Sequence, residues 1–313
     1  MTFLQTWLRS EDLENILATK TTAFGIFKDA ENSVERFGES ALISQRSDNP
    51  EILLGFQKWC DSVGWAPQRI YLRQLVKGPN TGNIPRLLRG EEDEKPREIV
   101  QELGLSYEVD FSQSTSVGLF CDQRANRTFL RSLAPKRVLN LFSYTCAFSV
   151  LAAEAGASTI NVDSSRAALT RGKRNFALND ISTDGHRFVD EDVAVYLRRL
   201  AKREETFDAV IVDPPTFGRA GSRGTFRLER DFGSLVEGVA RIAGPRCAIL
   251  LSTNFSFWNS RRIQKEAAVH LPGGTKFVQA PLAGSGEHLS SSATTWALLP
   301  ESCGEFHLKD GFV

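Results

Sequence analysis

The sequence predicts an α/β protein in which helices cover both faces of a parallel sheet. Two observations lead to this prediction. From about residue 137 onward, short apolar runs alternate with longer helical patterns. Four successive apolar runs also end in a carboxylate or amide side chain. A small α+β domain is predicted ahead of this sheet in residues 1–106, which leaves 107–313 for the larger domain. At 313 residues the chain is long enough to bury both cores.

Residues 1–106 mix strand and helix patterns. The strands that we expect, rich in branched and aromatic residues, are TTAFGIF (21–27), ALISQ (41–45) and RIYLRQLV (69–76). A helical pattern covers 51–65, and the turn-rich, charged segment 77–98 predicts an exposed loop. Beyond it, residues 107–111 and 116–122 are expected to pair as a hairpin.

The larger domain repeats a strand and a helix several times. The expected strands are RVLNLF (137–142), STINVD (158–163), HRFVD (186–190), FDAVIVD (207–213) and CAILLST (247–253). The expected helices are 148–157, 164–180, 193–203 and 229–243. Ser164 or Ser165 suits a helix N-cap, while Gly156 and Gly244-Pro245 suit helix ends. The runs TKFVQA (275–280) and TTWALLP (294–300) are expected to close a seven-stranded sheet as an antiparallel pair.

Polar side chains mark the ends of four successive predicted strands. They are Asn140, Asp163, Asp192 and Asp213. Because the carboxyl ends of parallel strands meet at one edge of a sheet, these side chains are expected to line one rim. A carboxylate after the second strand can accept from both ribose hydroxyls, and one beside a backbone N–H suits an adenine edge. Asp163 and Asp192 could instead serve only as helix caps.

Two loops at this rim have distinct chemistry. The fourth strand runs into Asp213-Pro214-Pro215-Thr216-Phe217, and proline stops strand pairing because it lacks an N–H. This leaves a rigid polar loop with an aromatic ring, although a purely structural turn is the alternative. After the first strand, the small residues around Tyr144 would let the backbone approach a ligand ahead of a helix N-terminus.

Aromatic side chains after the fifth strand allow two interpretations. Phe255, Phe257 and Trp258 could form a platform on which a nucleic-acid base stacks. They could equally pack in the core. Phe226, in contrast, is expected to be a packing residue.

Taken together, these motifs resemble the class I S-adenosylmethionine-dependent methyltransferases, and more narrowly the bacterial large-subunit rRNA base methyltransferases. The segments with this resemblance are GLFCDQRANR (118–127), VLNLFSYTCAFSVLAAEAGA (138–157), ALNDI (177–181), VDPPTF (212–217) and RDF (230–232). The resemblance covers roughly residues 107–300 and implies a Rossmann-like methyltransferase sheet of seven strands.

The resemblance also implies roles for individual residues. The expected cofactor-binding residues are Asp122, Arg124, Asn140, Phe142, Tyr144, Thr145, Cys146, Ala147, Asp163, Ser164, Asp192, Val193 and Asp213. Of these, residues 140–147 would hold the methionine part of S-adenosylmethionine, Asp163 the ribose, and Asp192 with Val193 the adenine. Asp122 and Arg124 would close over the cofactor.

The expected catalytic residues position the base to be methylated. They are Asp213, Pro214, Thr216 and Phe217, with Phe217 as a stacking surface. Two departures from the family pattern are visible. Many relatives have a glycine where Cys146 stands. Many also carry an extra N-terminal RNA-binding module, which this sequence is expected to lack.

The placement of cysteines favours a nitrogen acceptor. Methylating carbon-5 of a pyrimidine requires a cysteine nucleophile at the rim. The fourth and fifth strands end instead in Pro215-Thr216 and Ser252-Thr253-Asn254, while Cys247 lies at the far start of the fifth strand. We therefore predict methyl transfer to a base nitrogen. The resemblance implies that the base belongs to RNA, and DPPTF together with LSTN (251–254) most resembles the guanine-modifying members, so guanine in 23S rRNA is the expected substrate. Methylation of a protein or small molecule, and carbon-5 methylation of an RNA pyrimidine, remain the alternatives.

Composition narrows the class of protein. Residues 1–110 carry 13 basic and 18 acidic side chains, whereas residues 111–313 carry 25 basic and 20 acidic ones. The basic surplus of the second part suits a polyanionic partner, or it belongs to solvated helix faces. The scattered cysteines and histidines show no metal-ligand spacing, so no metal is expected. A dinucleotide-dependent oxidoreductase is disfavoured because the first turn lacks G-x-G-x-x-G. With no apolar run of about 18 residues and no secretory signal pattern, we expect no membrane contact and a cytoplasmic monomer or homodimer.

Overall fold

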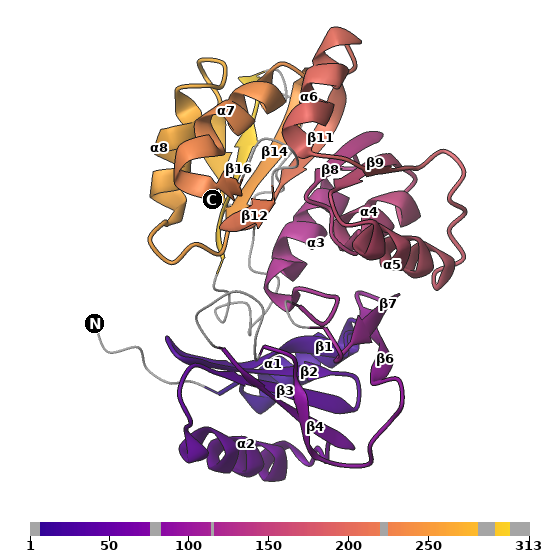
Figure 1. Ribbon diagram of the computed structural model, residues 1–313, viewed down its shortest axis with the longest axis vertical. Coiled ribbons are helices and arrows are strands. Elements are labelled where there is room, and N and C mark those ends of the chain that lie inside the picture. The colour runs from indigo at the N-terminus through magenta and orange to yellow at the C-terminus, as the bar shows by residue number, and fades with distance from the viewer. Residues whose placement is uncertain (1–6, 76–82, 114–115, 220–224, 281–291, 301–313) are drawn as a thin grey trace. The chain divides into compact units, whose positions relative to one another are not determined.

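The computed structural model describes residues 7–75, 83–113, 116–219, 225–280 and 292–300, and the chain forms two compact units (Figure 1). The first unit holds the described residues up to Arg124, and the second holds those from Ala125 onward. The sequence placed the division at residue 106. That residue lies inside a strand of the first unit, so the unit extends beyond it.

The first unit is built on a five-stranded sheet with the order β1-β2-β3-β4-β5. Its strands are β1 (Ala23–Lys28), β2 (Asn32–Phe37), β3 (Ser40–Gln45), β4 (Arg69–Gln74) and β5 (Arg86–Arg89). Helix α1 (Ser10–Ala18) precedes them, and α2 (Pro50–Val63) makes the crossover that lets β3 and β4 run parallel. Asn49 caps α2 by accepting from the Glu51 N–H, and Gly64 ends it in the left-handed region at φ 66°.

Some expectations for this unit are corrected by the structure. The segment 77–98 is not all loop, because it contains β5 and the start of β6 (Arg97–Glu102). The hairpin expected between 107–111 and 116–122 is wrong. Instead β6 pairs with β7 (Leu105–Asp110) through Leu103 and Gly104, whose φ values of 55° and 80° suit a tight two-residue hairpin turn. Residues 121–123 form the short 3₁₀ helix η1 (Cys121–Gln123).

The second unit contains a seven-stranded sheet with the order β10-β9-β8-β11-β14-β16-β15. Its strands are β8 (Arg137–Leu141), β9 (Ser158–Asp163), β10 (Arg187–Asp190), β11 (Phe207–Val212), β14 (Ala243–Thr253), β15 (Lys276–Val278) and β16 (Ala293–Leu298). The first five strands in the sheet order are parallel, and β16 runs antiparallel to both of its neighbours. The predicted seven-stranded, Rossmann-like α/β sheet is confirmed.

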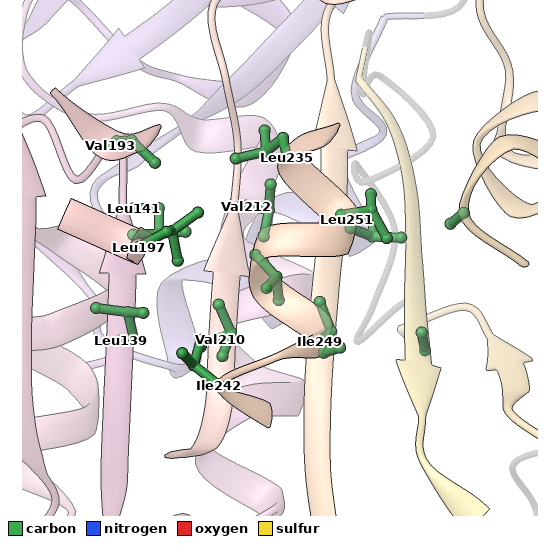
Figure 2. Packing of buried hydrophobic residues seen from close by; sticks show 14 of the residues in the cluster. Leu139, Leu141, Val193, Leu197, Val210, Val212, Leu235, Ile242, Ile249 and Leu251 are labelled. Carbon is green, nitrogen blue, oxygen red and sulfur yellow. The ribbon is translucent and has the colours of Figure 1, made fainter. Parts of the chain in front are cut away.

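Helices cover both faces of this sheet. They are α3 (Arg124–Ser132), α4 (Ala147–Glu154), α5 (Arg166–Ala177), α6 (Val193–Lys202), α7 (Leu228–Ala240) and α8 (Ser260–Ala268). On one face, Leu139, Val210 and Ile249 of the strands pack with Leu197 of α6 and Leu235 of α7 (Figure 2). The alternate residues Val138, Ala209, Ile211 and Leu250 pack with α3 and α4 on the other face. Burial on both faces explains why these strands read as continuous apolar runs.

Helix α7 ends earlier than the sequence suggested. It stops at Ala240, and Gly244-Pro245 lies inside β14 instead of closing the helix. The proline is tolerated because the register of β14 with β11 is irregular between Phe207 and Ala209, and pairing with β16 begins only at Ala248.

Candidate cofactor and acceptor site

The strand order creates a topological switch point between β8 and β11. From β8 the chain proceeds to β9 and β10 on one side, then returns to β11 and β14 on the other. Asn140 pairs with Ile211 and Leu141 with Val212, so the loops that begin at Phe142 and Asp213 leave the sheet side by side. Ligands bind at such points in open α/β sheets, outside the carboxyl ends of the strands.

The loop after β8 has an unusual backbone. Phe142, Tyr144 and Cys146 have φ values of 55°, 47° and 62°, and the residues between them do not have positive φ. Residues other than glycine rarely adopt this left-handed region of backbone conformation, and such strain is often found at functional sites. Directly after this loop, α4 begins at Ala147.

Neighbouring elements hold this loop in its strained form. The Ser143 N–H donates to the Val162 carbonyl at 3.0 Å, and the Tyr144 N–H donates to Asp163 Oδ2 at 2.9 Å. From α5, Asn175 Nδ2 donates to the Thr145 carbonyl at 2.9 Å. The loop is therefore fixed by three separate segments of the chain.

Helix α5 contributes more to the site than the sequence suggested. Arg171 Nη1 donates to the Tyr144 hydroxyl at 3.3 Å, and its guanidinium lies 5.9 Å from the centre of the Tyr144 ring. Gly172 packs against Cys146 on the same side of the helix. Sequence analysis missed Arg171, Gly172 and Asn175. The signal available was their spacing, since residues i and i+4 share one helix face.

Asp163 lies at the end of β9, as predicted, and is tied to both adjoining loops. Its Oδ2 accepts from the Tyr144 N–H, and its Oδ1 accepts from the Ser165 N–H at 2.8 Å. Burial raises the pKa of the Asp163 carboxyl and the charge of Asp190 adds to the rise, while the two N–H groups oppose it. Each oxygen keeps a further lone pair for a hydroxyl donor. The N-cap of α5 is Ser165, and Ser164 is an exposed neighbour.

Asp192 serves as the N-cap of α6, which was one of its two predicted roles. Its Oδ1 accepts from the Val195 N–H at 3.0 Å. The Val193 N–H lies in the first turn of α6, where the geometry of a helix gives a backbone N–H no partner. The second carboxylate oxygen of Asp192 likewise has no partner within the helix. The Val193 side chain is buried in the core, so only its backbone could face a ligand.

The loop 213–217 after β11, called the acceptor loop below, is connected to two neighbours. Pro214 is buried, and Thr216 Oγ1 donates to Asn254 Oδ1, just beyond β14, at 3.0 Å. Phe217 begins β12 (Phe217–Arg219), which pairs with β13 (Thr225–Arg227). From β13, the Phe226 ring lies 5.7 Å from the Phe142 ring. The loop after β8 and strand β13 therefore contact each other. Phe226 is a packing residue, as expected.

Asn140 lies inside the sheet and not at its rim, and two further predicted residues lie outside the second unit. Asn140 lies within β8, 2% exposed, and its Nδ2 donates to Ser149 Oγ of α4 at 2.9 Å. Asp122 lies in η1 and Arg124 begins α3, and both belong to the first unit. Their closure over a cofactor stays a prediction.

The last residues of the segment DQRANR, from Ala125 onward, have a packing role within the second unit. Asn126 Oδ1 accepts from the Trp296 indole N–H at 2.9 Å, joining α3 to β16. The Arg127 guanidinium lies 5.5 Å from the Phe148 ring centre. Among the described residues, no helix could cross a membrane, and no group of three or more His, Cys, Asp and Glu could hold a metal ion.

Comparison with known families agrees with this geometry. Residues 65–280 match the model of the family described as S-adenosylmethionine-dependent methyltransferase. The chain belongs to this family. The resemblance inferred from the motifs is confirmed, and S-adenosylmethionine is the cofactor of this family.

Individual relatives of this methyltransferase point the same way. Over 195 residues it is 32% identical to the ribosomal RNA large subunit methyltransferase K of Neisseria meningitidis serogroup B, covering 61% of this chain and 54% of that one. Over 163 residues it is 37% identical to the ribosomal RNA large subunit methyltransferase K/L of a Psychrobacter species, covering 50% and 20%. The match thus spans about half or less of these relatives.

A solved structure covers more of the methyltransferase. The protein SMU.776, crystallised with SAH, aligns with a TM-score of 0.76 at 25% identity, over 92% of this chain and 78% of that one. The residues present fit such a nucleoside cofactor. The loop after β8 leads directly into the N-terminus of α4, and the Asp163 carboxylate retains lone pairs for ribose hydroxyls.

Proposed function

We propose that this methyltransferase transfers the methyl group of S-adenosylmethionine to a base nitrogen of RNA, and that the base is guanine in 23S ribosomal RNA. The observation behind this proposal is the acceptor loop. It leaves the sheet at the switch point beside the cofactor loop, and Thr216 is joined to Asn254. Bound S-adenosylmethionine supplies an electrophilic methyl group on a sulfonium, so the protein has to position the acceptor and exclude water.

The cofactor side of the proposal assigns one part of the ligand to each strand end. The loop 142–147 and the N-terminus of α4 hold the methionine portion, and Asp163 accepts from the ribose hydroxyls. The free oxygen of Asp192 and the Val193 N–H meet the adenine edge. Asp122 and Arg124 are proposed to close over the cofactor, as the resemblance implies.

The acceptor side assigns Asp213 and the Pro214 carbonyl as acceptors for the N–H groups of the base. An amine or amide N–H on the base would be held by these oxygens, which turns the nitrogen toward the methyl group. As the nitrogen–carbon bond forms, the bond from that carbon to the sulfonium sulfur would break, and the N–H proton would pass to the Asp213 carboxylate. Thr216 fixes the loop, and the side chain of Phe217, the predicted stacking surface, lies outside the described part of the structure. Catalysis then depends on positioning and on a fixed polar environment.

The described cysteines support nitrogen over carbon as the acceptor. Cys60, Cys121, Cys146 and Cys247 are all buried. Burial raises the pKa of Cys146 to about 12 and also raises that of Cys247. A thiol that is buried and protonated at neutral pH is a poor nucleophile toward a pyrimidine ring. Carbon-5 methylation through these cysteines is therefore disfavoured.

The proposed RNA substrate draws on the relatives as well as on charge. The matched relatives are named as methyltransferases of the large-subunit ribosomal RNA. The larger domain has a basic surplus, which suits a polyanion. Ribosomal RNA is a cytoplasmic substrate, so the proposal places the enzyme in the cytoplasm.

The deciding experiment compares the nucleosides of rRNA from a deletion strain with those of its parent by mass spectrometry. We expect one methylguanosine to be missing from 23S rRNA, and to return when the wild-type gene is restored. A strain restored with Asp213→Ala should still lack it. The matched control is Asp184→Ala, which changes an exposed acid in the turn before β10 and should restore the methylation.

Other outcomes would overturn the proposal in identifiable ways. A missing 5-methylpyrimidine would show that carbon is the acceptor. Unchanged rRNA, together with methyl label found in protein or in a small metabolite, would identify a different substrate class.

A further inference from the structure

The loop after β14 divides three aromatic side chains between the core and the solvent. Trp258 is 6% exposed and packs edge-on against Phe232 of α7, with 5.0 Å between ring centroids. Phe255 is half-buried against the same core. Phe257 remains 78% exposed. The sequence left open whether all three pack or all three form a platform, and the structure assigns them different places.

The exposed ring of Phe257 is held by its neighbours. The Phe255 N–H donates to Thr253 Oγ1 at 3.1 Å, and the Trp258 N–H donates to the Phe255 carbonyl at 2.9 Å. These bonds form a tight turn with Phe257 near its tip. The Phe255 ring lies against the Phe257 ring at 5.2 Å in an edge-on arrangement. Phe257 is therefore an aromatic surface supported from one side and open to solvent.

Its position relates this ring to the acceptor loop. Val212 pairs with Leu251, so the loops after β11 and β14 emerge next to each other. Asn254, three residues before Phe257, accepts the hydrogen bond from Thr216 of the acceptor loop. An isolated exposed aromatic residue is ordinary on a protein surface, but this one adjoins the acceptor side of a methyltransferase site.

The helix that follows the ring is basic. Helix α8 contains Arg261, Arg262 and Lys265 and a single acid, Glu266. Arg262 lies 5.1 Å from the Trp258 ring centre, which ties the cationic helix to the aromatic turn. A flat ring next to clustered cations suits single-stranded nucleic acid, in which a base stacks on the ring and phosphates meet the charges.

We propose that Phe257 is a stacking surface for an unpaired base of the RNA substrate beside the acceptor loop. Phe255 supports its ring, and α8 attracts the adjoining phosphates. This inference rests on the proposed RNA methyltransferase function and adds a substrate-binding residue to the same site. Single-stranded RNA is recognised mainly by bases splayed onto aromatic faces, and one such stack requires only an accessible ring.

The test measures methyl transfer to 23S rRNA transcribed in vitro, with kcat and KM determined separately for three variants. Phe257→Ala should raise KM for the RNA by roughly ten- to a hundredfold, because base stacking on an aromatic side chain is lost. Phe257→Leu keeps an apolar side chain without a flat face, and should lose nearly as much. Phe257→Trp keeps a flat aromatic ring, so its KM should stay close to that of the wild type.

Two controls separate stacking from a general defect. The affinity of each variant for S-adenosylmethionine, measured by calorimetry, should equal that of the wild type. Val269→Ala removes another apolar side chain, 77% exposed, at the opposite end of α8, and should leave KM unchanged.

The outcomes also distinguish this inference from the function on which it rests. If wild-type protein binds cofactor but transfers no methyl group to RNA, the proposed function fails and this inference fails with it. If the wild type is active and Phe257→Ala or Phe257→Leu keeps the wild-type KM, only the stacking role is overturned.

Discussion

The Sγ atom of Cys146 lies 2.5 Å from the point that a Cβ atom on Gly172 would occupy. Cys146 is fully buried and stands at φ 62°, in the loop that follows β8, and Gly172 belongs to α5. A glycine at the position of Cys146 would accept this backbone without strain. Here the thiol fills the space that the absent side chain of Gly172 leaves.

This relationship predicts a coupled pair of substitutions. Gly172→Ala should destabilise the protein by about 1–3 kcal/mol, because the added methyl group overpacks a rigid contact. In a Cys146→Gly background the same change should cost about 1 kcal/mol less, since the thiol is gone. Urea unfolding of the four proteins measures this coupling as shifts of the transition midpoint.

The control for this cycle is Gly273→Ala. Within the described part of the chain, no atom beyond its immediate neighbours lies within 4 Å of the point that the added methyl group would occupy. It should change the free energy of unfolding by less than about 0.5 kcal/mol. Equal costs of Gly172→Ala in both backgrounds would show that the contact with Cys146 does not limit the packing.

Asp163 and Asp213 should separate cofactor binding from turnover. Asp163→Ala removes the acceptor of the Tyr144 and Ser165 N–H groups as well as the proposed ribose ligand. We expect calorimetry to detect no binding of S-adenosylmethionine, since hydrogen bonds to charged groups contribute about 1.5–3 kcal/mol each. Asp213→Ala should bind the cofactor with little change and lose turnover. Normal turnover by Asp213→Ala would show that the assigned acceptor loop is wrong.

The sheet and its order of elements could be predicted because burial on both faces leaves long apolar runs that differ from helical patterns. The carboxyl rim followed from the same reasoning, and Asp163 lies where it was expected. Asn140 could not be placed as well. A polar residue near the end of an apolar run does not reveal whether it faces solvent or, as here, donates to Ser149 within the sheet interface.

Features that depend on packing between distant parts of the chain could not be predicted from the sequence. The support of the cofactor loop by Arg171, Gly172 and Asn175 depends on how α5 lies against that loop. The β6–β7 hairpin was missed because its turn contains Leu103, a residue that rarely adopts positive φ. The three aromatic residues after β14 could be sorted only once their burial was known.

The hydrogen bond between Thr216 and Asn254 should matter for catalysis more than for stability. Both residues are accessible to solvent, so Thr216→Val and Asn254→Ala should each change the free energy of unfolding by less than about 0.5 kcal/mol. Each should lower kcat/KM for RNA, because the acceptor loop loses a fixed position. In the double variant the losses should fall short of additive by about 0.5–1.5 kcal/mol in activation free energy. Fully additive losses would show that the bond does not position the loop.

His186 should make the stability of the second unit depend on pH. Its Nδ1 accepts from the Thr159 N–H at 3.2 Å, and its ring packs edge-on against Phe176. Burial lowers the pKa of His186 below its ordinary value near 6.5. The unfolded chain therefore takes up the proton first as the pH falls. The stability that the neutral ring contributes is present above about pH 6.5 and is lost as the pH drops through the folded pKa. Urea unfolding between pH 5 and 8 should show this loss in the wild type and a weaker pH dependence in His186→Asn, whose side-chain oxygen can still accept from Thr159. An identical pH dependence in the two proteins would assign the effect to other groups.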